Sequence, residues 1–109
     1  MKSTTLDTQE ANSKWWAARD RAMKNAVNKS NFTEMEQLRA VRMQTFLQEV
    51  YRGTVYPPSY GIKGISVKVQ RGAVLGDRKA LRAVEDNWAQ LGVVKKVTPQ
   101  GTTYRIPKQ

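Results

Sequence analysis

The sequence predicts an α+β domain that is mainly helical, with two amino-terminal helices and a carboxy-terminal β-hairpin. Two observations predict this class. Apolar residues recur at helical spacing over residues 13–27, 33–52 and 77–91. After Gly92, a residue type that commonly ends helices, two stretches rich in β-branched residues flank a turn that contains proline and glycine.

The first expected helix follows a polar, aperiodic stretch over residues 1–11, which we expect to be a mobile tail. Residues 12–109 are expected to form a single domain. Ser13 is the expected cap of a helix that runs to about Val27. Its apolar residues fall in two adjacent rows: Trp16, Met23 and Val27, and beside them Trp15, Ala18, Ala22 and Ala26. Paired tryptophans can stack on bases, but they more often anchor a helix on its neighbours, and we expect packing here.

The second expected helix begins with a capping box, Thr33-Glu-Met-Glu36. We expect it to run to about Arg52 and to be ended by Gly53. Leu38 and Val41 lie opposite the main apolar stripe, which predicts contacts on two faces of this helix. The main stripe consists of Met43, Phe46, Leu47 and Val50, with Met35 at its border.

The middle of the chain leaves two interpretations open. Residues 56–61 contain two consecutive prolines and are expected to form a rigid connector. In residues 61–70, apolar and polar residues alternate, and the apolar ones are all β-branched. This pattern favours a strand at least as strongly as a helix, with Lys68 on the polar side. The alternating apolar residues are Ile65, Val67 and Val69.

The third expected helix covers about residues 77–91, with Asp77 as its cap and Gly92 behind it. Two strands should follow, Val93 to Thr98 and Thr102 to Ile106, and Thr98-Pro-Gln-Gly101 between them suits a type I turn. The apolar stripe of the helix consists of Leu81, Val84, Trp88 and Leu91. Lys79, Arg82, Asp86 and Gln90 lie roughly opposite this stripe, with Arg78 at its border.

Composition excludes several kinds of chemistry. The chain of 109 residues contains neither cysteine nor histidine, which excludes disulfides, thiolate nucleophiles, zinc sites of cysteine and histidine, and histidine acid–base catalysis. The two close acid pairs, Glu34/Glu36 and Glu85/Asp86, are better explained by a helix first turn and an exposed face. We therefore expect a protein that is not an enzyme and uses no cofactor or metal.

The same residues predict where the protein works. No apolar run approaches the roughly 18 residues of a membrane span, and Met1 to Asn12 lack the apolar centre of a signal peptide. We expect no membrane partner and a place in the cytoplasm, including the nucleoid or the ribosome, or in the nucleus or an organelle if the source has one.

Charge gives the strongest functional indication. The formal net charge is +10, and residues 63–109 hold ten basic residues against three acids. Phosphate binding is the usual reason for such a field, although a solvated basic face or an acidic protein partner would also fit. The candidate nucleic-acid-binding residues are Lys68, Arg71, Arg78, Lys79, Arg82, Gln90, Lys95, Lys96 and Arg105.

Residues 80–106 resemble the winged helix-turn-helix family of nucleic-acid-binding proteins. The matching pieces are Ala80-Leu81 with Val84, Leu91-Gly-Val-Val94, and Gly101-Thr-Thr-Tyr-Arg-Ile106. The resemblance implies a recognition helix at about residues 77–91, which reads base edges through Arg78, Lys79 and Arg82. It also implies a basic wing at about residues 93–106, with Lys95, Lys96 and Arg105 on the flanking backbone or in the minor groove. In that family, residues 61–70 would hold a second helix, so their β pattern is a departure.

A second resemblance concerns the amino-terminal half. Trp15-Trp16, then Arg19-Asp-Arg21, then Ala26-Val27 is similar to a family of small winged-helix proteins of the eukaryotic ribosomal small subunit. The resemblance implies binding to ribosomal RNA by charge and shape. The lysine-rich arm at the start of that family is missing here.

Three functions follow, in order of preference. The first is a DNA-binding transcriptional regulator, for which duplex DNA is the partner and a homodimer through the amino-terminal helices would read paired half-sites. The second is an RNA-bound structural protein such as a ribosomal component. The third is a protein-interaction module that uses Trp15, Trp16 and the helix of Met43 and Phe46.

Overall fold

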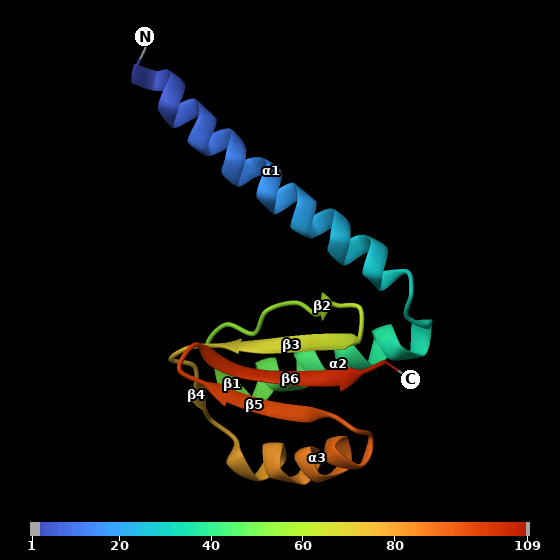
Figure 1. Ribbon diagram of the computed structural model, residues 1–109. Helices are drawn as coiled ribbons and strands as arrows, with labels where there is room; N and C mark the ends of the chain where they lie inside the picture. The colour runs from blue at the N-terminus through green and yellow to red at the C-terminus, as the bar shows by residue number, and fades with distance from the viewer. Residues whose placement is uncertain (1–2, 109) are drawn as a thin grey trace.

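A computed structural model describes residues 3–108, with residues 3–12 as backbone alone. In this part of the chain, three helices and six strands form an α+β fold with two antiparallel sheets (Figure 1). The helices are α1 (Ser3–Lys29), α2 (Glu34–Val50) and α3 (Arg78–Gln90). The strands are β1 (Tyr51–Arg52), β2 (Ser59–Tyr60), β3 (Gly64–Gln70), β4 (Val74–Leu75), β5 (Val94–Thr98) and β6 (Gly101–Pro107).

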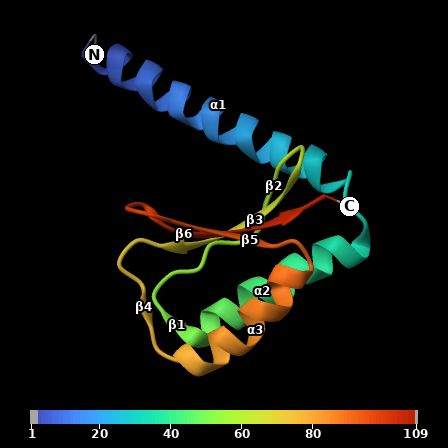
Figure 2. The same cartoon turned by 60° about the horizontal axis from the view of Figure 1, so that its bottom comes forward.

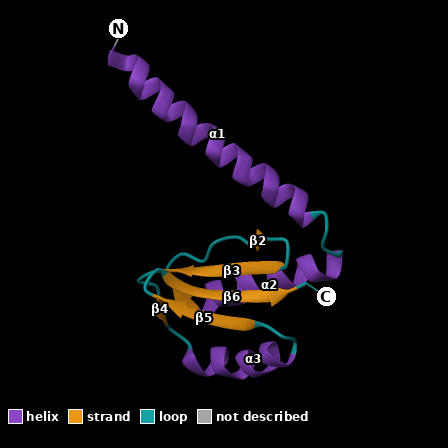
Figure 3. Cartoon of the chain, in the orientation of Figure 1, coloured by secondary structure: helices purple, strands orange, loops and turns teal. Residues whose placement is uncertain are grey.

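The main sheet has the strand order β2-β3-β6-β5, and every neighbouring pair is antiparallel (Figure 3). The sequence left helix and strand as alternatives for residues 61–70. The structure has strand β3 there, which confirms the strand interpretation. Ile65, Val67 and Val69 are buried, and Lys68 is exposed, as the alternation predicted. The second helix that the winged-helix resemblance implied here is therefore replaced by a strand, because β-branched residues pack well on a pleated surface.

Helices α2 and α3 cover one face of this sheet, and α1 lies on its other side (Figure 2). The core between the helices and the sheet contains Leu47 of α2, Leu81 of α3, and Ile65 and Tyr104 of the sheet. Trp88 of α3 lies edge-on to Phe46, with 5.7 Å between ring centroids, and edge-on to Tyr104 at 5.4 Å. These contacts confirm that Trp88 belongs to the packed stripe of its helix.

The first helix starts earlier than predicted. Its backbone is already helical at Ser3, so Ser13 does not cap it, and residues 3–11 of the expected tail belong to the helix. Residues 1 and 2 of that tail lie outside the described part of the chain. Near its other end, Asn25 and Asn28 hold the helix to edge strand β2. The Tyr60 N–H donates to Asn25 Oδ1 (2.6 Å), and Asn28 Nδ2 donates to the Tyr60 carbonyl (3.0 Å).

Helix α2 begins with the predicted capping box. The Glu36 N–H donates to Thr33 Oγ1 at 3.1 Å, and the Thr33 N–H donates to Glu36 Oε1 at 3.0 Å. The predicted end was wrong: the helix stops at Val50, because residues 51 and 52 pair with β4 as strand β1. Gly53 follows that strand rather than the helix. Glycine is needed at this position for two reasons. Its φ is +141°, and a Cβ added to it would lie only 2.7 Å from the Cβ of Ala73.

Helix α3 and the hairpin follow the prediction closely. Asp77 caps the helix, since its Oδ1 accepts from the Ala80 N–H at 3.0 Å. Gly92 has a φ of +87°, which is the left-handed conformation expected after a helix end. Strands β5 and β6 are joined by the predicted turn at residues 98–101. Leu91 is an exception in the predicted stripe, because 42% of it is exposed.

Candidate nucleic-acid interface

All nine predicted nucleic-acid-binding residues are exposed. The structure distributes them over two surfaces, one on the main sheet and one on α3. Three of them, Lys68, Lys96 and Arg105, gather on the sheet. Four lie along α3, and the remaining two, Arg71 and Lys95, lie apart from both groups.

The first surface is the sheet face that the helices α2 and α3 leave uncovered. Residues that lie directly opposite each other in an antiparallel pair point to the same side of the sheet. Lys68 is opposite Thr103, and Thr103 is opposite Lys96, so this row crosses three strands. In the next row, Arg105 lies between Ser66 and Val94. We call this surface the open sheet face; it consists of Ser66, Lys68, Gln70, Val94, Lys96, Thr98, Thr103 and Arg105.

The three cations of the open sheet face are close neighbours. Because adjacent strands lie about 4.8 Å apart, the backbones at Lys68 and Lys96 are separated by roughly 10 Å. A shallow depression beside Arg105 is also lined by Lys63 and Ser66. Lys63 was not among the predicted site residues, although its place between two glycines next to a basic strand was visible in the sequence.

The strands of this face contribute no acid that would offset its positive charge. Aspartate and glutamate are absent from residues 51–76 and 87–109. These two segments include all six strands. A surface with charge of one sign raises the local concentration of oppositely charged ligands. The open sheet face is therefore suited to a polyanion.

The second surface is the exposed side of α3. It carries Arg78, Lys79, Arg82 and Gln90, as the helical spacing predicted. Unlike the open sheet face, this surface also carries acids. Arg78 and Arg82 line a depression together with Glu85 and Asp86. The field along α3 is thus weaker than the number of its cations suggests.

Lys95 does not join Lys96. It is opposite Tyr104 in the sheet and so points to the helix side, where its Nζ lies 3.2 Å from Glu85 Oε2 and 5.7 Å from the Tyr104 ring centroid. Adjacent strand residues always point to opposite faces, so the sequence already contained the signal that separates these two lysines. Arg71 lies in the exposed turn that follows β3.

The described residues contain no cluster of three or more side chains that are suited to binding a metal. Within residues 3–108, no helix has both the length and the apolar character needed to cross a membrane. Comparisons with protein-family models, with curated proteins and with solved structures found no match for the chain.

Proposed function

We propose that the protein binds nucleic acid, with duplex DNA as its preferred partner, and that the open sheet face contacts the phosphates. One observation carries this proposal: Lys68, Lys96 and Arg105 share a face whose strands contain no acid. Thr103 lies between Lys68 and Lys96, and Ser66 lies beside Lys68 and opposite Arg105. Both add hydroxyl donors, which commonly bind phosphate oxygens.

In this proposal, α3 supplies the sequence-dependent contacts of a transcriptional regulator. Its exposed side carries arginines, which can hold guanine by two hydrogen bonds, and Gln90, which can do the same for adenine. The acids beside Arg82 make this helix a poor purely electrostatic contact, which fits a role in reading base edges better than one in binding phosphates. Such a regulator would act in the cytoplasm, at the nucleoid, or in a nucleus.

Structured RNA is the second candidate partner. A face that binds phosphates recognises charge and shape, and this is how proteins bind folded RNA. A single strand is a poorer ligand for this surface, because the open sheet face includes no aromatic side chain on which unpaired bases would stack.

Fluorescence anisotropy over a salt series tests the proposal with duplex DNA, single-stranded DNA and structured RNA. If four to six phosphates are contacted, the logarithm of the duplex DNA binding constant should fall with the logarithm of salt at a slope of roughly −4 to −5. Tighter binding to one duplex than to structured RNA supports the regulator, and the reverse order supports the RNA-bound protein. Undetectable binding to all three ligands at low salt refutes both.

Variants assign the surfaces. Changing Lys68, Lys96 and Arg105 together to alanine should reduce the slope by about 0.9 per lost phosphate contact, or about 2.7 for three contacts. Changing Arg78, Lys79 and Arg82 to alanine should weaken binding and reduce the preference among duplex sequences, without unfolding the protein. The control changes three exposed cations that lie on neither surface, Arg21, Lys24 and Arg52, to alanine. It removes the same number of positive charges as each test variant. Equal loss in this control would mean that total charge, and not the open sheet face, determines binding.

A further inference from the structure

Helix α1 presents an apolar row to solvent. Trp16 is 59% exposed, Met23 is 57% exposed and Val27 is 63% exposed. At 100° per residue these three side chains share one face, together with Asp20, and we call these four residues the α1 stripe. Exposed large apolar side chains that share one face of a helix are a feature of interaction surfaces.

The α1 stripe points away from the rest of its own chain. Asn25 and Asn28, which hold α1 to Tyr60, lie on roughly the opposite side of the helix. Helix α1 also projects from the β2 edge, on the side of the sheet opposite to α2 and α3 (Figures 1 and 2). The described part of the chain therefore leaves the stripe exposed, and a partner for it would come from another molecule.

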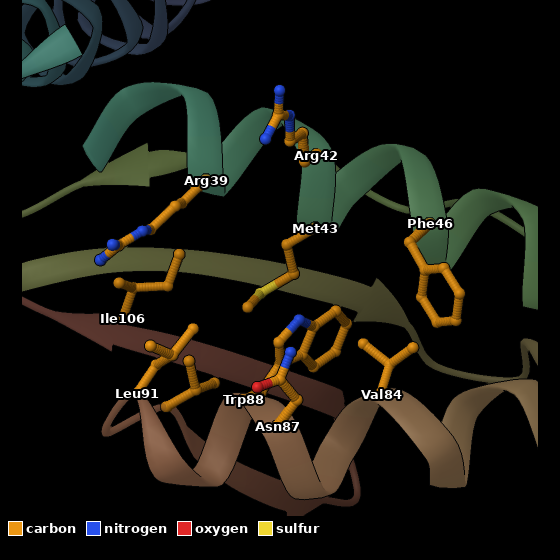
Figure 4. Close-up of a pocket in the computed structure, with 10 residues that line it drawn as sticks. Arg39, Arg42, Met43, Phe46, Val84, Asn87, Trp88, Leu91 and Ile106 are labelled. Atoms are coloured by element: carbon orange, nitrogen blue, oxygen red, sulfur yellow. The ribbon is translucent and has the colours of Figure 1, made fainter. Parts of the chain in front are cut away.

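A groove between α2 and α3 has the complementary character. Its volume is about 410 Å³. Figure 4 shows Met43 and Phe46 of α2 pointing toward Val84 and Trp88 of α3, with Arg39 at one end beside Ile106. Arg42 lies at the rim, and the described residues that line the groove include no acid. We call this the α2/α3 groove.

We propose that the α1 stripe of one copy binds in the α2/α3 groove of a second copy. At 1.5 Å per residue the whole stripe, Trp16 to Val27, spans about 16 Å, and its part from Trp16 to Met23 spans about 10 Å, which matches Arg39 to Phe46 along the groove. The charges agree as well. Asp20 lies in the middle of the stripe, where its carboxylate would face Arg39 and Arg42. Among the described residues of the single chain, Asp20 pairs with exposed Lys24 at 3.2 Å, and an exposed pair of this kind contributes little stability that its exchange would lose.

This arrangement refines the expected homodimer through the amino-terminal helices, because α1 contacts a groove rather than another α1. The homodimer closes when each copy places its α1 stripe in the α2/α3 groove of the other; a contact made in one direction only would leave a stripe and a groove free to add further copies. The proposal does not rest on nucleic-acid binding, and it is tested without nucleic acid.

Sedimentation velocity of the full chain over a concentration series tests it. The stripe variant changes Trp16 and Met23 to serine, and the groove variant changes Arg42 and Asn87 to glutamate; all four residues are exposed, so the fold should survive. Wild type should associate, and each variant should associate at least about tenfold more weakly, because tryptophan and arginine commonly dominate interfaces. An equimolar mixture of the two variants should recover association, because each supplies the surface that the other lacks.

Two control variants match these changes elsewhere. Met35 and Leu38 on the exposed side of α2 are changed to serine, and Arg52 is changed to glutamate; both controls should associate like wild type. Circular dichroism verifies that every variant is folded. Three results would each overturn the proposal. The first is a wild type that stays monomeric at every concentration, and the second is a mixture of folded variants that does not recover association. The third is loss of association in the stripe variant but not in the groove variant, which would indicate that α1 pairs with α1.

Discussion

Replacing Tyr104 with phenylalanine is expected to stabilise the protein. Tyr104 is 1% exposed and lies at the centre of the core, edge-on to Trp88. Its hydroxyl oxygen is buried and has no hydrogen-bond partner among the described residues. The nearby Tyr51 phenol raises the pKa of Tyr104 both by charge and as a side-chain hydrogen-bonding group, but its position does not give the Tyr104 hydroxyl a hydrogen bond of ordinary distance and angle.

The expected size of the effect follows from this isolation. A buried polar group without a partner costs about 1–3 kcal/mol, whereas the phenylalanine ring would keep the contacts with Trp88. We expect Tyr104→Phe to raise the free energy of unfolding by about 1 kcal/mol. For a domain of this size, that corresponds to an increase in Tm of roughly 4 °C or somewhat more.

Urea unfolding followed by circular dichroism measures this change. The midpoint should move to higher urea while the slope with urea stays the same, because the surface exposed on unfolding hardly changes. Tyr56→Phe is the matched control, since Tyr56 is 41% exposed and its midpoint should not move. A loss of stability by about 1 kcal/mol would refute the reasoning, because it would mean that the hydroxyl has a hydrogen-bond partner, with Tyr51 the nearest candidate.

The same tyrosine predicts sensitivity to alkaline pH. Burial raises the pKa of Tyr104 well above its usual value, and charge on Tyr51 and Glu85 raises it further. Because the pKa is higher in the folded state than in the unfolded state, the neutral tyrosine contributes to the free energy of unfolding. This contribution is complete below the unfolded pKa of about 10 and decreases as the pH rises above that value. Burial also raises the pKa of Tyr60. Wild type should therefore lose stability above about pH 10, and Tyr104→Phe should lose less. Equal losses would contradict this assignment.

Two further predictions concern local backbone features, each measured as the free energy of unfolding in urea. Thr33→Ala removes the capping hydroxyl of α2 and should cost about 1 kcal/mol, whereas Thr45→Ala on the exposed side of that helix should cost less. Gly101→Ala should cost roughly 2 kcal/mol or more, because φ is +135° and the new Cβ would collide with the Val69 carbonyl. Gly72→Ala is the control, because Gly72 also has a positive φ but an added Cβ would meet no atom within 4 Å. If both variants lost the same free energy of unfolding, the collision at Gly101 would be excluded as the cause.

Most helix starts and stops with local signals were predicted correctly; the exception is Ser13, where α1 continues through the expected cap to Ser3. The capping box at Thr33, the cap at Asp77 and the exit at Gly92 all depend on residues within one turn, and the structure contains all three. The end of α2 was mispredicted because it depends on pairing with β4, more than twenty residues later in the chain. Sequence periodicity near Arg52 carries no information about that partner.

The open sheet face was predictable only in part. The alternation in residues 65–69 and in the hairpin shows which side chains share a side within each strand. It does not show that β3 pairs with β6, so it does not place Lys68 beside Lys96. That step needs the non-local register in which Thr103 lies between the two lysines. The candidate residues were thus identifiable from the sequence, but the division between two surfaces was not.

The absence of acids around the open sheet face is not a requirement of the fold. Two like charges 10 Å apart in water repel by only about 0.4 kcal/mol, so the sheet tolerates them easily. An acid in place of exposed Gln70, on the same face, would still relieve that repulsion at little cost to packing. The strands nevertheless carry cations and neutral residues alone. A polyanionic partner accounts for this bias, because an acid on the face would repel phosphates while adding little to stability.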